Sequence, residues 1–160
     1  TQAVTFPRVT QNNKNEVENA YFKVKIPDDW TYDENINTFR IQHNGECKNS
    51  DGGVCEISAE SAGHGDVDVL YNNRLGTENV LKEYQPDFVG EIKQYETKLF
   101  DLDVKAFSSK HTSGSTYYFF AFSYANAAVG ITANVNDKCL ANGFDIEKFI
   151  TENFSLKKLG

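Results

Sequence analysis

One strand-like segment, Thr116–Ala125 (TYYFFAFSYA), most constrains how this chain can fold. In a β-strand successive side chains point to opposite faces, and here both sets are largely apolar or aromatic. A strand of this kind belongs in the middle of a sheet that is covered on both sides. We therefore expect a layered protein around a central sheet, and 160 residues suffice for one domain with a proper core.

Regular patterns elsewhere predict the remaining elements. Alternation of apolar and polar residues predicts strands at Ala20–Pro27, Thr38–His43, Val54–Glu60, Gln94–Phe100, Leu102–Ser109 and Val129–Val135. A short helix is expected over 66–75, a second that Thr77 caps and Pro86 ends, and a third that Asp145 caps. These elements predict an α+β layered sandwich, in which helices pack on the faces of a central, mostly antiparallel sheet of six or seven strands. Residues 1–19, polar and rich in Asn and Gln, are expected to form a flexible leader before a single domain at 20–160.

Three segments, in this order, resemble the PsbP-like family. YFKVKIPDDWTYDE is similar to its opening strand, LDVKAFSSKHTSGSTYYFFAFSYANAAVGITANV to a hairpin pair, and FDIEKFITENFSLKK to its closing helix and last strand. The family is named for an extrinsic subunit of photosystem II, and a small Ran-binding import factor shares its fold. The resemblance implies a non-enzymatic accessory domain, secreted or membrane-anchored, that docks on a larger extracytoplasmic protein complex. A metal- or small-ligand-binding protein is the alternative.

The overall charge of the chain narrows the class of partner. The formal net charge of −7 would repel the phosphate backbone of nucleic acids. We therefore do not expect nucleic acids as partners. No apolar run approaches the roughly 18 residues needed to span a bilayer. The sequence does not begin with Met, and its polar start resembles the spacer after a cleaved signal or a lipid anchor. We expect an extracytoplasmic monomer, with a cytoplasmic location as the alternative.

The three cysteines bear on the compartment. Cys47 and Cys55 end the turn-rich segment CKNSDGGVC, and a hairpin centred near Asp51 would bring both sulfurs to one side. A disulfide there would be worth about 2.5 kcal/mol in the chain-entropy model. It would also indicate an oxidising compartment. Two reduced thiols are the alternative, and Cys139 is expected to be a free, buried or half-buried thiol.

Two polar clusters are candidate ligand sites. His64, Asp66 and Asp68 could hold zinc or manganese, unless Asp66 caps a helix instead. Four acidic residues around Trp30 could form a docking surface or bind calcium: Asp28, Asp29, Asp33 and Glu34. The simpler interpretation is a solvated turn that ends the first strand, with Trp30 folded onto the core.

Catalytic machinery is not evident in the sequence. His43 is expected at the core or its rim, and His111 in a solvent-facing loop. The motifs GxSxG, P-loop, GxGxxG and HExxH are absent from the sequence. The sequence therefore predicts no enzyme and no cofactor beyond a possible divalent metal.

Overall fold

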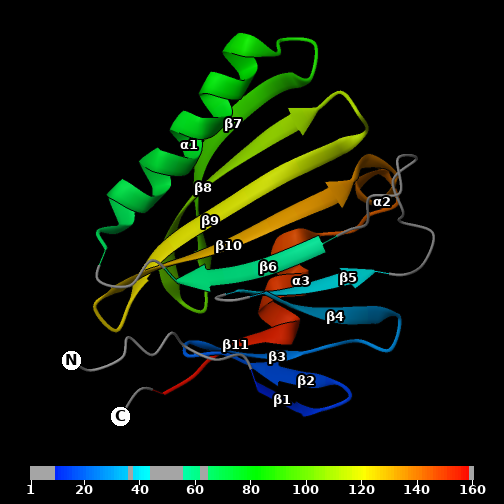
Figure 1. Ribbon diagram of the computed structural model, residues 1–160, viewed down its shortest axis with the longest axis vertical. Coiled ribbons are helices and arrows are strands. Elements are labelled where there is room, and N and C mark those ends of the chain that lie inside the picture. The colour runs from blue at the N-terminus through cyan, green and yellow to red at the C-terminus, as the bar shows by residue number, and fades with distance from the viewer. Residues whose placement is uncertain (1–9, 36–37, 44–55, 62–64, 159–160) are drawn as a thin grey trace.

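The computed structural model describes residues 10–35, 38–43, 56–61 and 65–158, whose strands form two antiparallel sheets (Figure 1). The smaller sheet has the order β1 (Thr10–Asn13), β2 (Glu16–Glu18), β3 (Phe22–Lys25), β11 (Phe154–Leu156). The larger sheet has the order β4 (Trp30–Asn35), β5 (Thr38–His43), β6 (Glu56–Ser61), β10 (Ala127–Asn136), β9 (Ser115–Tyr124), β8 (Leu102–His111), β7 (Val89–Leu99). The helices are α1 (Val67–Tyr84), α2 (Asp137–Ala141) and α3 (Ile146–Asn153).

The predicted fold class is wrong. It placed one central sheet of six or seven strands between helices, whereas the described chain is mostly β, with its strands divided between two sheets. Part of the error lies in three segments whose sequences do not show a strand pattern. Thr10–Asn13 and Glu16–Glu18 have too few apolar residues to show a strand pattern, and Trp30–Asn35 resembled a turn because of its acidic residues. Pairing with neighbouring strands, which is not visible locally, makes them strands.

The second half of the expected flexible leader is part of the folded domain. Val17 of β2 pairs with Val24 of β3 and is fully buried in the main core. The backbone N–H of Ile26 also donates to the carbonyl of Asn15 at 2.7 Å. One buried valine and a backbone ladder are therefore enough to hold residues 10–19 against the sheet. Residues 1–9 lie outside the described part of the chain.

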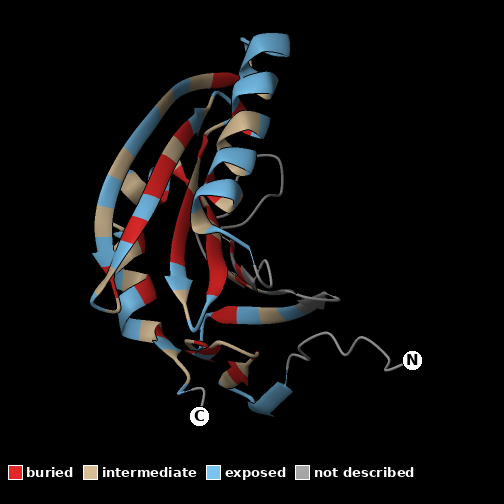
Figure 2. Cartoon of the chain, turned by 90° about the vertical axis from the view of Figure 1, so that its left-hand side faces the viewer, coloured by how far each residue is buried: buried red, intermediate tan, exposed pale blue. Residues whose placement is uncertain are grey.

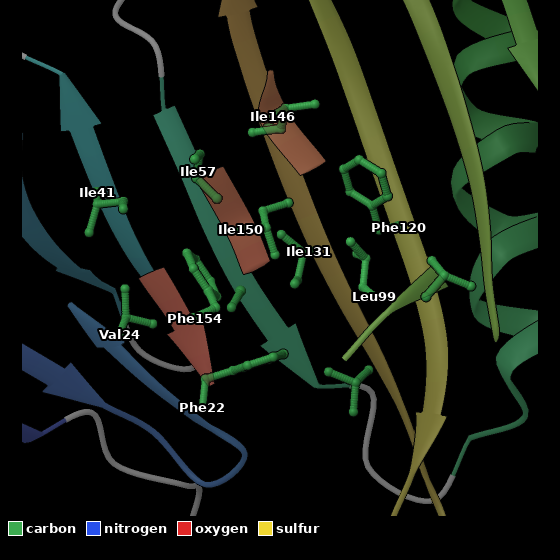
Figure 3. Packing of buried hydrophobic residues seen from close by; sticks show 14 of the residues in the cluster. Phe22, Val24, Ile41, Ile57, Leu99, Phe120, Ile131, Ile146, Ile150 and Phe154 are labelled. Atoms are coloured by element: carbon green, nitrogen blue, oxygen red, sulfur yellow. The ribbon is translucent and has the colours of Figure 1, made fainter. Parts of the chain in front are cut away.

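The prediction for the doubly apolar strand is confirmed. β9 lies between β8 and β10, and Phe119, Phe120, Ala121 and Phe122 are each at most 1% exposed. Phe120 and Phe122 belong to the main core with residues from both sheets and α3, several of which point toward one another in Figure 3. Phe119 and Ala121 face the other way and pack under α1.

The mid-chain helix differs from its prediction. One helix, α1, replaces the two expected ones, and Asp66 rather than Thr77 caps it by accepting from the Asp68 N–H at 2.7 Å. Its buried residues are Tyr71 and Glu78. Val80 and Tyr84 of the same helix are 52% and 78% exposed. Figure 2 shows the helix standing largely exposed beside the buried middle strands.

The closing helix follows its prediction. Asp145 caps α3 by accepting from the N–H groups of Glu147 and Lys148, and Ile146 and Ile150 are buried. The chain then enters β11, which pairs with β3 and so joins the C-terminal strand to the smaller sheet. This connection fixes α3 over the main core, close to the start of β4.

Candidate functional site

A groove beside Trp30 is the best candidate for a binding site. It lies between the start of β4 and α3, has a volume of about 410 Å³, and we call it the aromatic groove. Its lining residues are Pro27, Asp29, Trp30, His43, Phe144, Phe149, Glu152 and Asn153. Large aromatic side chains in a partly open hollow are typical of the residues that dominate binding energy at protein interfaces.

Four rings build the floor of the aromatic groove. Trp30 stacks on Phe149 with a centroid distance of 4.5 Å, and Phe144 lies 5.7 Å from Phe149. The ring of His43 meets Trp30 edge-on at 5.3 Å, because the two residues face each other across the β4–β5 pair. Trp30 is buried, whereas Phe144 and Phe149 are only half-buried. The two phenylalanines are therefore the rings that a ligand can reach.

The rim of the aromatic groove carries exposed carboxylates. Asp29 Oδ2 lies 2.7 Å from His43 Nε2, and its side chain remains 65% exposed. Glu152 lies on α3 with its side chain 60% exposed, and its contact with Lys148 is loose, at 3.9 Å. A groove with an aromatic floor and an acidic rim suits a ligand that is both apolar and positively charged.

A second cleft lies beneath the first turns of α1. Its volume is about 530 Å³, and its lining includes Val67, Leu102, Thr97, Ser123 and Lys105. Lys105 is already engaged, because its Nζ lies 2.5 Å from Asp68 and 5.9 Å from the centre of the Tyr71 ring. The hydrogen bond that Lys105 donates to Asp68 raises the pKa of Lys105. We call this the helix cleft.

The structure also contains a buried polar cluster that the sequence did not reveal. Glu78 of α1 accepts from the Ser109 hydroxyl at 2.7 Å, and His111 Nε2 lies 2.6 Å from the same oxygen. The prediction of a solvent-facing His111 is wrong, since its side chain is only 12% exposed and its ring stacks on Tyr117. The only sequence signal was an acidic residue at a helix position facing the sheet.

This cluster ties the helix to the sheet and is not arranged as a catalytic triad. In a triad the imidazole accepts the proton of the serine, but here Ser109 donates to the carboxylate. Burial alone would raise the pKa of Glu78, but the hydrogen bonds from His111 and Ser109 outweigh it and hold that pKa below its ordinary value.

The predicted metal site is only partly within the described chain. Asp66 caps α1 and Asp68 pairs with Lys105, so both carboxylates already have protein partners. His64 lies outside the described residues. Over the ranges that the structure describes, no group of three or more His, Cys, Asp or Glu is placed to hold a metal ion.

The four acidic residues proposed as a docking surface are distributed over a turn and a strand. Asp28 accepts from the Asn15 side chain at 3.1 Å, and Asp33 pairs with Arg40 across the sheet at 2.8 Å. Asp29 alone is a lining residue of the aromatic groove. Nothing is described of the Glu34 side chain. The stretch expected to be a solvated turn is therefore half strand, and Trp30 is packed on the core as expected.

The cysteine predictions have different outcomes. Cys139 is buried and disulfide-bonded, so the prediction of a free thiol is wrong. The expected Cys47–Cys55 bridge lies outside the described residues. The chain has three cysteines, and each can form one disulfide at a time, so a bond from Cys139 to either of the other two would compete with that bridge.

No model of a known protein family matches this sequence, and a search of curated proteins finds no relative. The resemblance to the PsbP-like family therefore stays a prediction. None of the helices in the described ranges is both long and apolar enough to cross a bilayer.

Proposed function

We propose that this protein is a non-enzymatic binding domain that docks on a larger protein assembly through the aromatic groove. The stacked pair of Trp30 and Phe149 carries the proposal, because it supplies a rigid aromatic floor with half-buried phenylalanine at its open side. Such anchors can contribute a large share of an interface's binding energy. The docking role is also what the resemblance to the PsbP-like family implies.

The polar groups near the described clefts support binding rather than catalysis. His43 and His111 each pair with a carboxylate, and the buried Ser109 donates to Glu78. Lys105 is held by Asp68. These groups are committed to contacts within the fold, so the proposal requires no metal, cofactor or catalytic residue.

We place the function outside the cytoplasm, in a secreted or membrane-anchored protein. The disulfide at Cys139 supports this location, because disulfides persist in oxidising compartments and are rare in the cytosol. With three cysteines, one disulfide leaves one free thiol per chain. Thiol titration of protein denatured without reductant should find one, and a count of three would contradict the proposed compartment.

The docking role is tested by the loss of a partner on mutation of the aromatic groove. Phe144→Ser removes a half-buried ring that borders the groove, and Val80→Ser is the control because Val80 is also a partly exposed apolar residue, on α1. Each protein, with its fold checked by circular dichroism, is mixed with the extracytoplasmic fraction of the source organism and analysed by size-exclusion chromatography. We expect wild type and Val80→Ser to co-elute with the same partner, and Phe144→Ser to elute alone.

Equal co-elution of all three proteins would contradict docking through the aromatic groove. Failure of the wild-type protein to retain any partner would contradict the docking proposal as well. The comparison of Phe144→Ser with Val80→Ser therefore distinguishes binding at the aromatic groove from non-specific binding by an acidic protein.

Binding of a small ligand is the second candidate function, and the helix cleft is the observation that favours it. Its lining combines apolar residues such as Leu102 with hydroxyl groups of Thr97 and Ser123, which suits a small amphipathic molecule. Ligand-observed NMR with a library of neutral fragments provides the test. Fragments that bind wild type but not Leu102→Trp, which fills the cleft, would support this candidate.

A further inference from the structure

A second hollow adjoins the aromatic groove, and we call the two together the trough. The second hollow has a volume of about 380 Å³ and shares Pro27 and Asn153 with the aromatic groove. Its other lining residues are Asn13, Asn15, Glu16, Lys25 and Ile26. The trough therefore runs from the end of α3, past Pro27, toward the turn between β1 and β2. An elongated site suits an extended polypeptide better than a compact small molecule.

The two halves of the trough differ in polarity. The aromatic groove has two half-buried phenylalanines below the exposed carboxylates of Asp29 and Glu152. The second hollow is rich in asparagine. Asn15 and Asn153 each donate one hydrogen bond within the fold, but an amide side chain has two N–H donors and an acceptor oxygen, so sites remain for a peptide backbone. There the charges of Glu16 and Lys25 balance, so the excess negative charge lies at the aromatic end.

The ring faces and carboxylates at the aromatic end match the chemistry of arginine. A guanidinium group stacks on aromatic rings and forms paired hydrogen bonds with carboxylates. The net charge of −7 favours approach of a basic segment over an acidic one. Asp29 contacts His43 and Glu152 contacts Lys148, yet the two carboxylate side chains remain 65% and 60% exposed. A further cation can therefore reach both carboxylates.

We propose that the trough receives an extended segment of a partner protein, with an arginine side chain in the aromatic groove; this inference rests on the docking function proposed above. The arginine lies against Phe144 and Phe149, with its guanidinium at Asp29 and Glu152. The backbone of the segment passes Pro27 and Asn153 and continues along the asparagines of the second hollow.

Fluorescence titration tests this directly, because Trp30 is the only tryptophan of the chain. The probes are the blocked heptapeptide acetyl-Ala-Ala-Ala-Arg-Ala-Ala-Ala-amide and the same peptide with neutral citrulline in place of arginine. We expect the arginine peptide to bind with a Kd about fivefold lower than that of the citrulline peptide, as a weak cation–π contact gives. Salt at about 0.5 M should narrow this difference.

Charge variants locate the guanidinium. Asp29→Asn and Glu152→Gln should each raise the Kd of the arginine peptide about threefold, as expected for exposed ion pairs, and leave that of the citrulline peptide unchanged. Asp103→Asn is the matched control, because its carboxylate is 95% exposed and lies at the helix cleft. It removes the same charge outside the trough and should change neither Kd.

Three results would overturn the arginine inference: equal Kd values for the two peptides, an equal effect of Asp103→Asn, or no saturable signal up to about 10 mM peptide. If any of these occurs while Phe144→Ser still loses its partner, the docking function stands and the arginine does not. If the arginine peptide binds as expected but Phe144→Ser keeps its partner, the proposed docking function fails instead.

Discussion

Two histidine–carboxylate pairs of nearly equal length occupy very different environments. His43 and Asp29 approach to 2.7 Å at the rim of the aromatic groove, where the Asp29 side chain is 65% exposed. His111 and Glu78 approach to 2.6 Å between α1 and the sheet, where both side chains are at most 12% exposed. Because water screens the first pair far more than the second, burial rather than distance should decide what each pair contributes to stability.

The comparison also separates two roles. The buried pair joins residues 33 positions apart and receives a further hydrogen bond from Ser109, so its carboxylate is engaged within the fold and largely shielded from an outside ligand. The exposed pair leaves Asp29 accessible at a groove lined by aromatic rings. The same two chemical groups therefore serve stability in one place and can serve recognition in the other.

The largest expected effect is the loss of the buried carboxylate. Glu78→Ala leaves the Ser109 hydroxyl and the His111 imidazole without their carboxylate partner in a largely buried site. We expect the free energy of unfolding to fall by about 3 kcal/mol, as is typical when one partner of a buried pair is removed. Urea denaturation followed by circular dichroism measures it, and a loss no greater than that of Asp29→Ala would refute the distinction between the pairs.

Acid should weaken the fold through the same group. The pKa of Glu78 is below its ordinary value despite burial, because His111 and Ser109 donate to its charged form. A depressed folded-state pKa contributes stability above the unfolded-state pKa of about 4.3, and this contribution disappears as pH falls through the folded value. Urea denaturation between about pH 6 and pH 3 should therefore show a smaller decrease in the free energy of unfolding with falling pH for Glu78→Gln than for wild type.

Ser109→Ala sharpens the pH prediction. The substitution removes one of the two hydrogen bonds that lower the pKa of Glu78. The decrease in its free energy of unfolding with falling pH should therefore lie between those of wild type and Glu78→Gln. If the free energy of unfolding of Glu78→Gln falls as steeply with pH as that of wild type, other carboxylates dominate the pH dependence of stability.

The smallest expected effect on stability is at the exposed pair. Asp29→Asn should lower the free energy of unfolding by less than about 1 kcal/mol, because exposed ion pairs contribute little. Its effect should be found in the peptide titration instead. A destabilisation as large as that of Glu78→Ala would assign Asp29 to the fold and weaken the case for the trough.

The sequence predicted elements better than their assembly. The doubly apolar TYYFFAFSYA and the cap at Asp145 are local signals, and the structure has β9 and α3 where they indicated. The polar β1 and β2 carry no such signal, and the acidic residues after Pro27 concealed β4. For the candidate site, the sequence singled out Asp29 and Trp30 but not Phe149 or Glu152, which lie more than a hundred residues later.

By itself, then, the sequence determined the strand at the centre of the sheet, the closing helix and the net negative charge. Alternation and capping are properties of neighbouring residues, so the chain carries them wherever it folds. The tertiary structure alone decided that Trp30 stacks on Phe149 and that Glu78 is buried against His111. Such pairs depend on strand order, register and the path of the chain between elements, which no local pattern specifies.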